Sequence, residues 1–187
     1  MNLSTDDPIK ENHAYWMRQA IEQAKQAANQ NEIPIGAVLV DLESGELLSE
    51  GYNQPISSSD PTAHAEIVVL RQASNRRKNY RLAATALYVT VEPCTMCVGA
   101  LMHARISLLV FGAREPKAGV VVSQKQLLEE SFYNHRLNYL EGIMAEECGA
   151  LLTDFFEKKR NFGRVFRDAR ARVGDFVSSH KLFLVCS

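Results

Sequence analysis

Two apolar segments rich in β-branched and aromatic residues limit the folds open to this chain. Residues 86–91 and 106–111 both have the composition of a buried strand. A short helix is predicted between them, beginning at Pro93 and carrying Cys97. Because strands and helices alternate in this way along the chain, we expect an α/β sheet covered by helices on both faces, with a functional site where neighbouring strand ends meet.

The other predicted elements follow from the same periodicity and capping rules. In chain order, the first are a helix over residues 12–30 capped by Asn12, a β-hairpin of residues 36–40 and 46–50, and a polar loop over 52–59. A helix from Asp60-Pro61 to about Ala73 follows the loop. Near the C-terminus, a helix passes through Cys148, Leu151, Leu152, Phe155 and Phe156 and ends near Gly163. No linker or internal repeat separates them. We therefore expect one domain over residues 1–187, with its core at 12–162 and a basic C-terminal extension at 163–187.

Composition excludes several classes of protein. Apolar residues make up 46% and charged residues 23%, as in an ordinary globular protein. No segment approaches the roughly 18 apolar residues of a membrane span, and the start lacks a secretory pattern, so we expect a cytoplasmic protein without membrane contact. The net charge is −1. Any attraction to nucleic acid must therefore be local. Seven basic residues and one acidic residue lie between Lys158 and Arg172. This segment is interpreted either as a phosphate-facing patch or as a solvated helix face.

Two short motifs contain the side chains that bind metals. Cys94 and Cys97 are separated by two residues, a spacing that in a reducing compartment indicates metal or redox chemistry rather than a disulfide framework. His64 and Glu66 follow the helix start predicted at Asp60. His64, Cys94 and Cys97 make three zinc ligands, and neither motif contains a fourth. This number is typical of catalytic zinc, which keeps one position for water, whereas structural zinc is closed by four protein ligands.

Each motif also has a simpler interpretation when it stands alone. His64 alone is typical of a cap or a polar surface group, Cys94 and Cys97 alone of a redox pair, and Glu66 alone of a carboxylate that interacts with a helix dipole. Residues two apart on a regular helix do not face the same way. His64 and Glu66 therefore flank one site only if the first helical turn permits it.

Taken together, His64-Ala65-Glu66 and Pro93-Cys94-Thr95-Met96-Cys97 resemble the signature of the zinc-dependent cytidine and deoxycytidylate deaminase superfamily. The chain between about residues 12 and 162 further resembles the family of bacterial tRNA-specific adenosine deaminases. The similar segments are residues 32–38, 53–55, 60–66, 79–82, 87–97, 110–114, 134–136 and 154–156.

This resemblance implies a fold, a cofactor and an activity. The fold is a cytidine deaminase-like three-layer α/β/α sandwich with a central mixed sheet of about five strands. The cofactor is one zinc ion per chain, held by His64, Cys94 and Cys97. The activity is hydrolytic conversion of the wobble adenosine of a tRNA anticodon to inosine, with Glu66 protonating the ring and then the departing ammonia, and Asn53 binding the target nucleoside.

The resemblance also implies a homodimer that binds a tRNA anticodon stem-loop. Residues implied to contact RNA are Arg114, Asn134, His135, Arg136, Phe156, Lys158, Lys159 and Arg160, whereas Phe155 is expected in the core. The chain departs from the family pattern at Glu115-Pro116 and at Val120, Val121 and Val122. These departures put the RNA contacts of that loop in question.

Two other functions remain open from the sequence. A deaminase of a free base or nucleoside, of the guanine or cytosine type, has the same metal chemistry and general fold. A non-catalytic module in which zinc only stabilises an RNA-binding fold would need a fourth ligand, for which His103, His135 and Cys148 are available.

Overall fold

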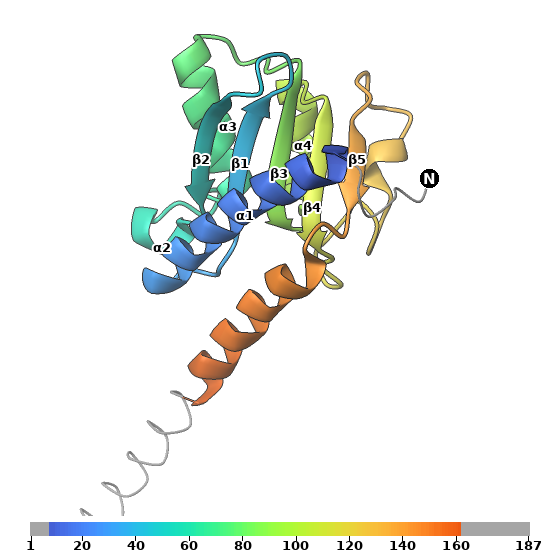
Figure 1. The fold of residues 1–187 in the computed structure, drawn as a ribbon. Helices are drawn as coiled ribbons and strands as arrows, with labels where there is room; N and C mark the ends of the chain where they lie inside the picture. The colour runs from blue at the N-terminus through green and yellow to red at the C-terminus, as the bar shows by residue number, and fades with distance from the viewer. Residues whose placement is uncertain (1–7, 162–187) are drawn as a thin grey trace, which may run out of the picture. The chain divides into compact units, whose positions relative to one another are not determined.

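A computed structural model describes residues 8–161 of the chain (Figure 1). The elements are α1 (Pro8–Asn29), β1 (Gly36–Asp41), β2 (Leu47–Tyr52), α2 (Pro55–Ser58), α3 (Ala65–Arg77), β3 (Thr85–Val91), α4 (Thr95–Ala104), β4 (Leu108–Ala113), the 3₁₀ helix η1 (Leu127–Glu129) and β5 (Asn138–Glu141). Residues 145–161 are also helical.

The five strands form one mixed sheet in the order β2-β1-β3-β4-β5. β1 pairs antiparallel with both β2 and β3, whereas β3 and β4, and β4 and β5, pair in parallel. β2, β3, β4 and β5 therefore run in one direction and β1 runs against them. The carboxyl ends of these four strands meet at one edge of the sheet, which is where α/β proteins place their sites.

Helices cover both faces of the sheet (Figure 1). On one face, α1 packs Met17, Ala20 and Ile21 against alternate residues of the central strands, such as Val38 and Tyr88. On the other face, α3 and α4 pack against the opposite set of strand residues. Because successive strand residues point to opposite faces, a strand covered on both sides must be apolar throughout. All seven residues of β3 are buried, as this arrangement requires. The predicted α/β/α sandwich with a central mixed sheet of about five strands is therefore confirmed.

Two helices begin later than the sequence indicates. The sequence places a helix start at Asp60-Pro61, but α3 begins at Ala65. The Asp60 carboxylate accepts hydrogen bonds from the Thr62 amide and hydroxyl groups and so closes a turn instead of capping a helix. In the same way, α4 begins at Thr95 and not at Pro93, because Cys94 is the N-cap residue.

Other boundaries also differ from the predictions. α1 begins at Pro8, which suits the first helical turn, so Asn12 lies inside the helix and is not its cap. The expected loop at 52–59 contains the short helix α2. Strand β5 has no counterpart among the elements predicted from the sequence; it is a four-residue edge strand without a buried residue, so it lacks the alternating pattern that marks a strand. The predicted helix end at Gly163 lies outside the described residues.

The chain divides after Leu152 into two compact units, each of which is described by itself. In the first unit, Cys148 and Leu151 pack with the cluster under α1. In the second unit, residues 153–161 continue as a helix. None of the helices within residues 8–161 combines the length and the apolarity that a membrane span requires.

Candidate metal centre

The candidate site lies at the sheet edge where β2, β3, β4 and β5 end. Asn53 directly follows β2, and Glu92 and Cys94 follow β3. His64 precedes α3, which packs against β2 and β1. The N-termini of α3 and α4 and the carboxyl ends of these strands therefore bring together residues that are far apart in the sequence.

His64 and Cys94 occupy equivalent positions at the two helix starts. Each is the N-cap residue of its helix and has an extended backbone, with φ −69° and ψ 153° at His64 and φ −81° and ψ 173° at Cys94. Cys97 lies in the first turn of α4. Because His64 is outside the regular helix and Glu66 is inside it, the rule that i and i+2 face apart does not apply. The later helix start thus removes the geometric objection to a shared site.

The three candidate ligand atoms lie at the separations expected around a cation with tetrahedral coordination. His64 Nδ1 lies 3.5 Å from Cys97 Sγ and 3.8 Å from Cys94 Sγ, and the two sulfurs are 3.7 Å apart. For zinc bonds of about 2.3 Å to sulfur and about 2.0–2.1 Å to nitrogen, tetrahedral angles give about 3.8 Å between sulfurs and about 3.6 Å from sulfur to nitrogen. All three separations match within about 0.3 Å. The donor set therefore fits one zinc ion.

The charges of the two thiols also suit a divalent cation. A hydrogen bond with Cys97, opposed by burial and supported by His64, lowers the pKa of Cys94 to about 3. The pKa of Cys97 is raised, first by its hydrogen bond to Cys94 and then by burial. Cysteine binds a metal as the thiolate, so a divalent cation favours the deprotonated form of both residues.

Glu66 is a buried carboxylate beside these ligands. Its side chain is 4% exposed. Burial raises the pKa of Glu66, whereas the nearby His64 and a hydrogen bond with Cys97 act in the opposite direction. A buried carboxylate with a raised pKa is the kind of group that can exchange protons with a bound molecule.

Asn53 connects the end of β2 to the start of α3. Its side chain is 3% exposed, and its Oδ1 accepts a hydrogen bond from the Ala65 amide at 2.8 Å. This bond satisfies one of the free amides in the first turn of α3, a role usually taken by the N-cap side chain, which is His64 here and makes no such bond. The two Nδ2 hydrogens of Asn53 remain available as donors to a ligand, because no hydrogen bond from them is present within residues 8–161.

The sequence did not indicate any role for Glu92. This carboxylate, 3% exposed, follows β3 and accepts hydrogen bonds from the amides of Glu115, Val121, Val122 and Ser123 and from the Ser123 hydroxyl. Its partners are distant in sequence, so no local pattern could have revealed it. The loop of residues 115–123 is therefore held by Glu92.

The residues considered as a fourth ligand lie elsewhere. His103 is exposed in the last turn of α4, the His135 ring nitrogen Nε2 bonds to the Ile106 carbonyl, and Cys148 packs against Gly112. Among the described residues, the group able to hold a metal consists of His64, Cys94 and Cys97 alone. Three protein ligands leave one position for water or substrate.

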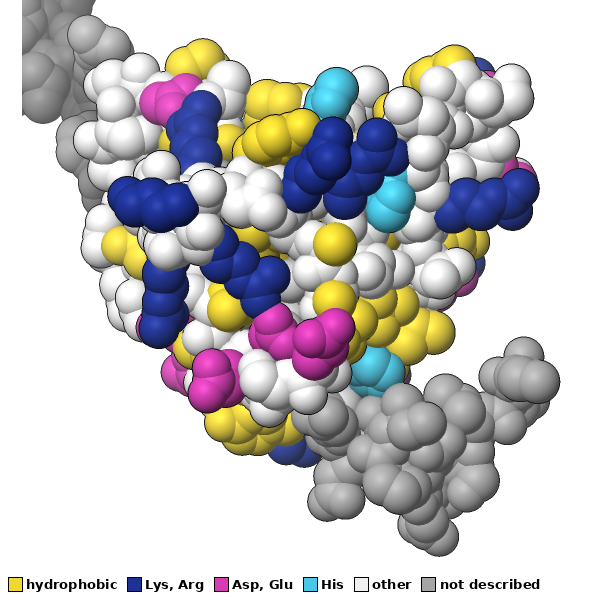
Figure 2. Space-filling view, turned by 90° about the horizontal axis from the view of Figure 1, so that it is seen from above, with side chains coloured by type: hydrophobic (Ala, Val, Ile, Leu, Met, Phe, Trp, Pro, Cys, Tyr) yellow, Lys and Arg dark blue, Asp and Glu magenta, His cyan; other side chains and the backbone are white. Residues whose placement is uncertain are grey.

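Asn134, His135 and Arg136 are not brought to this site. They precede β5, and Asn134 and His135 contact Arg105 and Ile106, which precede β4. Because β4 and β5 run parallel to β3, these residues lie at the opposite edge of the sheet from Cys94. Figure 2 looks onto that edge and shows Lys, Arg and His side chains gathered there. A cavity of about 170 Å³ is lined there by Arg81, His103, Arg105 and Asn134, among others.

The remaining predicted RNA contacts have varied surroundings. Arg114 follows β4 and lies at the same end of the sheet as the candidate site. It forms a bidentate ion pair with Glu141, with N–O distances of 2.7 and 2.8 Å. In the second unit, Phe156 is 42% exposed, and Lys159 lies over the Phe155 ring at 5.4 Å. Phe155 is half-buried there. Arg160 lies 3.8 Å from Glu157. Lys158 is exposed.

Comparison with known proteins agrees with this geometry. Residues 10–113 match the model of the cytidine and deoxycytidylate deaminase zinc-binding region. The chain is 49% identical over 144 residues to the tRNA-specific adenosine deaminase of Haemophilus influenzae, a match that covers 77% of this chain and 83% of that protein.

Solved structures also resemble this fold. One comes from a study of A-to-I editing by tRNA:A34 deaminases at the wobble position of transfer RNA; it is 38% identical, with a TM-score of 0.71, covering 74% of this chain and 99% of its own. A guanine deaminase from Nitrosomonas europaea has a TM-score of 0.65 at 21% identity, covering 83% of this chain and 97% of its own. At that identity the second likeness shows a common fold and nothing more.

Proposed function

The chain belongs to the cytidine and deoxycytidylate deaminase family and, within it, to the tRNA-specific adenosine deaminases, and on this premise we propose which of its residues convert adenosine 34 of a tRNA anticodon to inosine. The reaction is a hydrolytic deamination that consumes one water and releases ammonia. The observation that supports the assignment most strongly is the triangle of His64, Cys94 and Cys97 with the buried Glu66 beside it.

His64, Cys94 and Cys97 hold a single zinc ion. When bound, zinc acts as a Lewis acid that lowers the pKa of water. Glu66 would take one proton from the attacking water and pass it to the adenine ring, then take the second proton from the hydroxyl group formed on C6 and pass it to the departing amine. Burial favours this role, because it raises the pKa of Glu66 and so stabilises the protonated form relative to the carboxylate. Water adds to C6, the C6–N bond breaks, and inosine and ammonia leave.

Asn53 orients the nucleoside. Its Oδ1 is occupied by the Ala65 amide, so the side chain is fixed and its Nδ2 hydrogens have a defined direction. A base that reacts inside such a site must be turned out of its stack, and an anticodon loop presents unstacked bases at low cost. We therefore expect the protein to act on an anticodon stem-loop in preference to a duplex.

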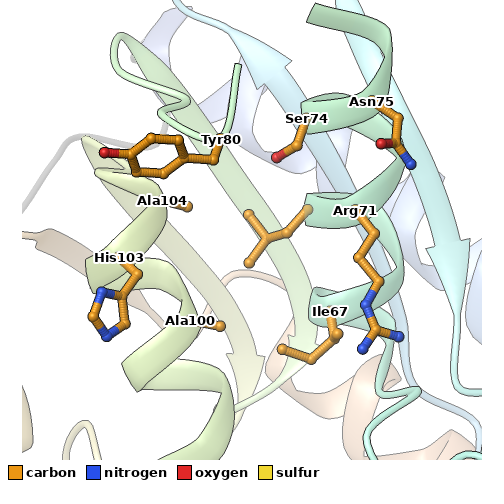
Figure 3. Close-up of a pocket in the computed structure, with 9 residues that line it drawn as sticks. Ile67, Arg71, Ser74, Asn75, Tyr80, Ala100, His103 and Ala104 are labelled. Carbon is orange, nitrogen blue, oxygen red and sulfur yellow. The ribbon is translucent and has the colours of Figure 1, made fainter. Parts of the chain in front are cut away.

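We further propose that the active protein is a homodimer. Asn134, His135 and Arg136 lie at the sheet edge away from the zinc ligands of their own chain, so a second copy is needed to bring them near a bound RNA. A candidate contact surface lies between α3 and α4, where a cavity of about 360 Å³ is lined by the apolar residues Ile67, Leu70, Ala100 and Ala104 and by Arg71, Ser74, Asn75, Tyr80 and His103 (Figure 3).

Inosine formation on a panel of anticodon stem-loops tests the function directly. The wild-type chain is expected to deaminate a stem-loop with adenosine at the wobble position, and to leave free guanine, cytosine and adenosine unchanged. Turnover of a free base together with an inert stem-loop would show the alternative, a deaminase of a free base or nucleoside. Sedimentation of the protein at the mass of a single chain under assay conditions would refute the dimer.

Glu66→Gln tests the mechanism separately from the fold. The variant keeps the side-chain volume and is expected to bind zinc in the same ratio to protein as wild type. Loss of a proton-transfer group typically lowers the rate by about 10²- to 10⁴-fold. Wild-type activity in a zinc-loaded Glu66→Gln protein would refute the proton-transfer role. A zinc-loaded wild type that is inactive on every substrate tested would favour the non-catalytic zinc module instead.

A further inference from the structure

We propose that Glu92 is a positioning residue, which fixes zinc ligand Cys94 by holding the loop of residues 115–123 against it. The inference rests on the proposed function only in taking Cys94 as a ligand. Glu92 itself does not point its carboxylate at the ligands; every hydrogen bond that the structure gives this carboxylate goes to the loop.

The Glu92 carboxylate organises the loop through both of its oxygens. Oε1 accepts the amides of Val121, Val122 and Ser123 at 3.0, 2.7 and 2.9 Å. Oε2 accepts the Glu115 amide at 3.0 Å and the Ser123 hydroxyl. One buried carboxylate thus gathers both ends of the loop. Hydrogen bonds to an ionised acceptor are stronger than neutral ones, so the loop has one preferred shape.

The loop in turn contacts the backbone at Pro93 and Cys94. Gly119 forms an isolated antiparallel β-bridge with Cys94, and the Val120 amide donates to the Pro93 carbonyl at 3.2 Å. Val120 and Val121 are buried, which anchors the loop from its other side. Cys94 is an N-cap residue with an extended backbone, so the helix does not fix its torsion angles. The bridge to Gly119 supplies this constraint.

The close approach at Gly119 shows how tightly the loop and the carboxylate fit. A Cβ atom added there would lie 2.4 Å from both Cδ and Oε2 of Glu92 and 2.7 Å from the Glu115 carbonyl oxygen. The loop would have to move away from Glu92 to accommodate a methyl group. Gly119→Ala therefore perturbs the same contact as a Glu92 substitution without changing the carboxylate.

An amide cannot replace the carboxylate at position 92. In Glu92→Gln one oxygen becomes an NH₂ group, which has no lone pair for an amide donor. In either orientation of the side chain, the NH₂ group faces another hydrogen-bond donor. That donor is the Glu115 backbone amide in one orientation and the three backbone amides of residues 121–123 in the other. Glu92→Gln thus removes the clamp while nearly preserving volume.

The experiment uses full-length, zinc-loaded protein and three variants, one at Glu92 and two in the loop. Glu92→Gln and Gly119→Ala disturb the clamp strongly, and Ser123→Ala removes only the hydroxyl bond. Ser49→Ala is the matched control, because it removes another buried hydrogen bond, from Ser49 Oγ to the Val69 carbonyl, away from the loop. Three properties are measured: zinc affinity by competition with a chromophoric chelator, the absorption bands of the cobalt-substituted protein, and hydrogen exchange of the amides at residues 121–123.

Zinc affinity is expected to fall by about 10- to 100-fold in Glu92→Gln and Gly119→Ala, the range found when an outer group that orients a metal ligand is lost. The cobalt bands shift in both variants, exchange of the residue 121–123 amides accelerates, and Ser123→Ala shows the same changes to a smaller extent. Ser49→Ala loses stability but keeps the wild-type zinc affinity and cobalt spectrum.

The proposal is overturned if exchange of the residue 121–123 amides accelerates while zinc affinity and the cobalt spectrum stay at wild type. It is also overturned if Glu92→Gln leaves that exchange unchanged. If Glu92→Gln does not fold, the same measurements on Gly119→Ala test the proposal. A wild-type zinc affinity in Gly119→Ala would refute the link between the loop and Cys94. None of these measurements requires catalysis, so a failure of the positioning role is distinguishable from a failure of the deaminase assignment.

Discussion

Asn53 makes one structural hydrogen bond and has a proposed role in substrate binding, and two substitutions separate these roles. Its Oδ1 supports the first turn of α3 through the Ala65 amide, and its Nδ2 is proposed to bind the nucleoside. Asn53→Ala removes both. Asn53→Asp keeps an oxygen in the Oδ1 position but replaces the donor by an acceptor. Stability is therefore expected to depend on the acceptor and activity on the donor.

The magnitude follows from the burial of the pair. Ala65 is fully buried and Asn53 is 3% exposed, so in Asn53→Ala the amide has no access to water as a substitute partner. An unsatisfied buried donor costs about 1–3 kcal/mol. For a chain of this size 1 kcal/mol corresponds to about 2–4 °C in Tm, which predicts a decrease of about 2–12 °C. In Asn53→Asp the carboxylate keeps the bond and lies at the positive end of α3, so its Tm is higher than that of Asn53→Ala.

The activity of Asn53→Asp follows from the same values. Leaving one polar group of the bound nucleoside without its donor costs about 1–3 kcal/mol, or about 5- to 150-fold in kcat/KM. The assay measures inosine formation on a stem-loop RNA at a temperature where every variant is folded, with Ser49→Ala as a control for stability alone. An Asn53→Asp protein as unstable as Asn53→Ala refutes the role of Oδ1. An Asn53→Asp protein with wild-type kcat/KM refutes the role of Nδ2.

Three further predictions concern stability, thiol reactivity and metal removal. Burial raises the pKa of Tyr88 to about 12, above its ordinary 10.0, so the stabilisation from its neutral form is complete below pH 10 and is lost as the pH rises toward 12. The free energy of unfolding in urea should therefore decrease less between pH 9 and pH 11 for Tyr88→Phe than for the wild type. Equal decreases would contradict this. Burial raises the pKa of Cys148 to about 12, so iodoacetamide at pH 8 is expected to modify it only in urea, and labelling of the folded protein seen by peptide mapping contradicts this. Chelation of zinc is expected to lower the Tm of the wild type but not that of Cys97→Ala, because a ligand that binds only the folded state stabilises it; an equal decrease in both proteins places the metal elsewhere.

Local patterns predicted the elements whose signal is local. The strand at β3 has seven buried residues in a row, and the spacing of Cys94 and Cys97 follows from one helical turn. The helix start at Asp60 was wrong for a physical reason: Asp fits both a helix cap and a turn, and here its carboxylate binds Thr62. A correct start at Ala65 would have explained at once how His64 and Glu66 reach one site.

Other features depend on pairing between distant segments. Glu92 has no local signal, because its partners come from residues 115–123. The position of Asn134, His135 and Arg136 follows only from the direction of β5, and β5 is too short and exposed to be recognised from its sequence. The resemblance therefore named residues implied to contact RNA but not the edge of the sheet on which they lie.

That separation leads to a prediction about mixed dimers. If a complete site combines Glu66 of one chain with Arg136 of its partner, Glu66→Gln and Arg136→Ala damage different halves of it. Arg136→Ala alone is expected to lower kcat/KM by about 10-fold or more, the cost of losing a charged contact. A mixed dimer, co-expressed with two tags and purified through both, contains one undamaged site. It should therefore have about half the activity of the wild-type dimer, as the two-fold symmetry of such an assembly requires. If Arg136 instead serves the zinc site of its own chain, both sites of the mixed dimer are damaged and its activity is no higher than that of the Arg136→Ala dimer, which would refute the shared site.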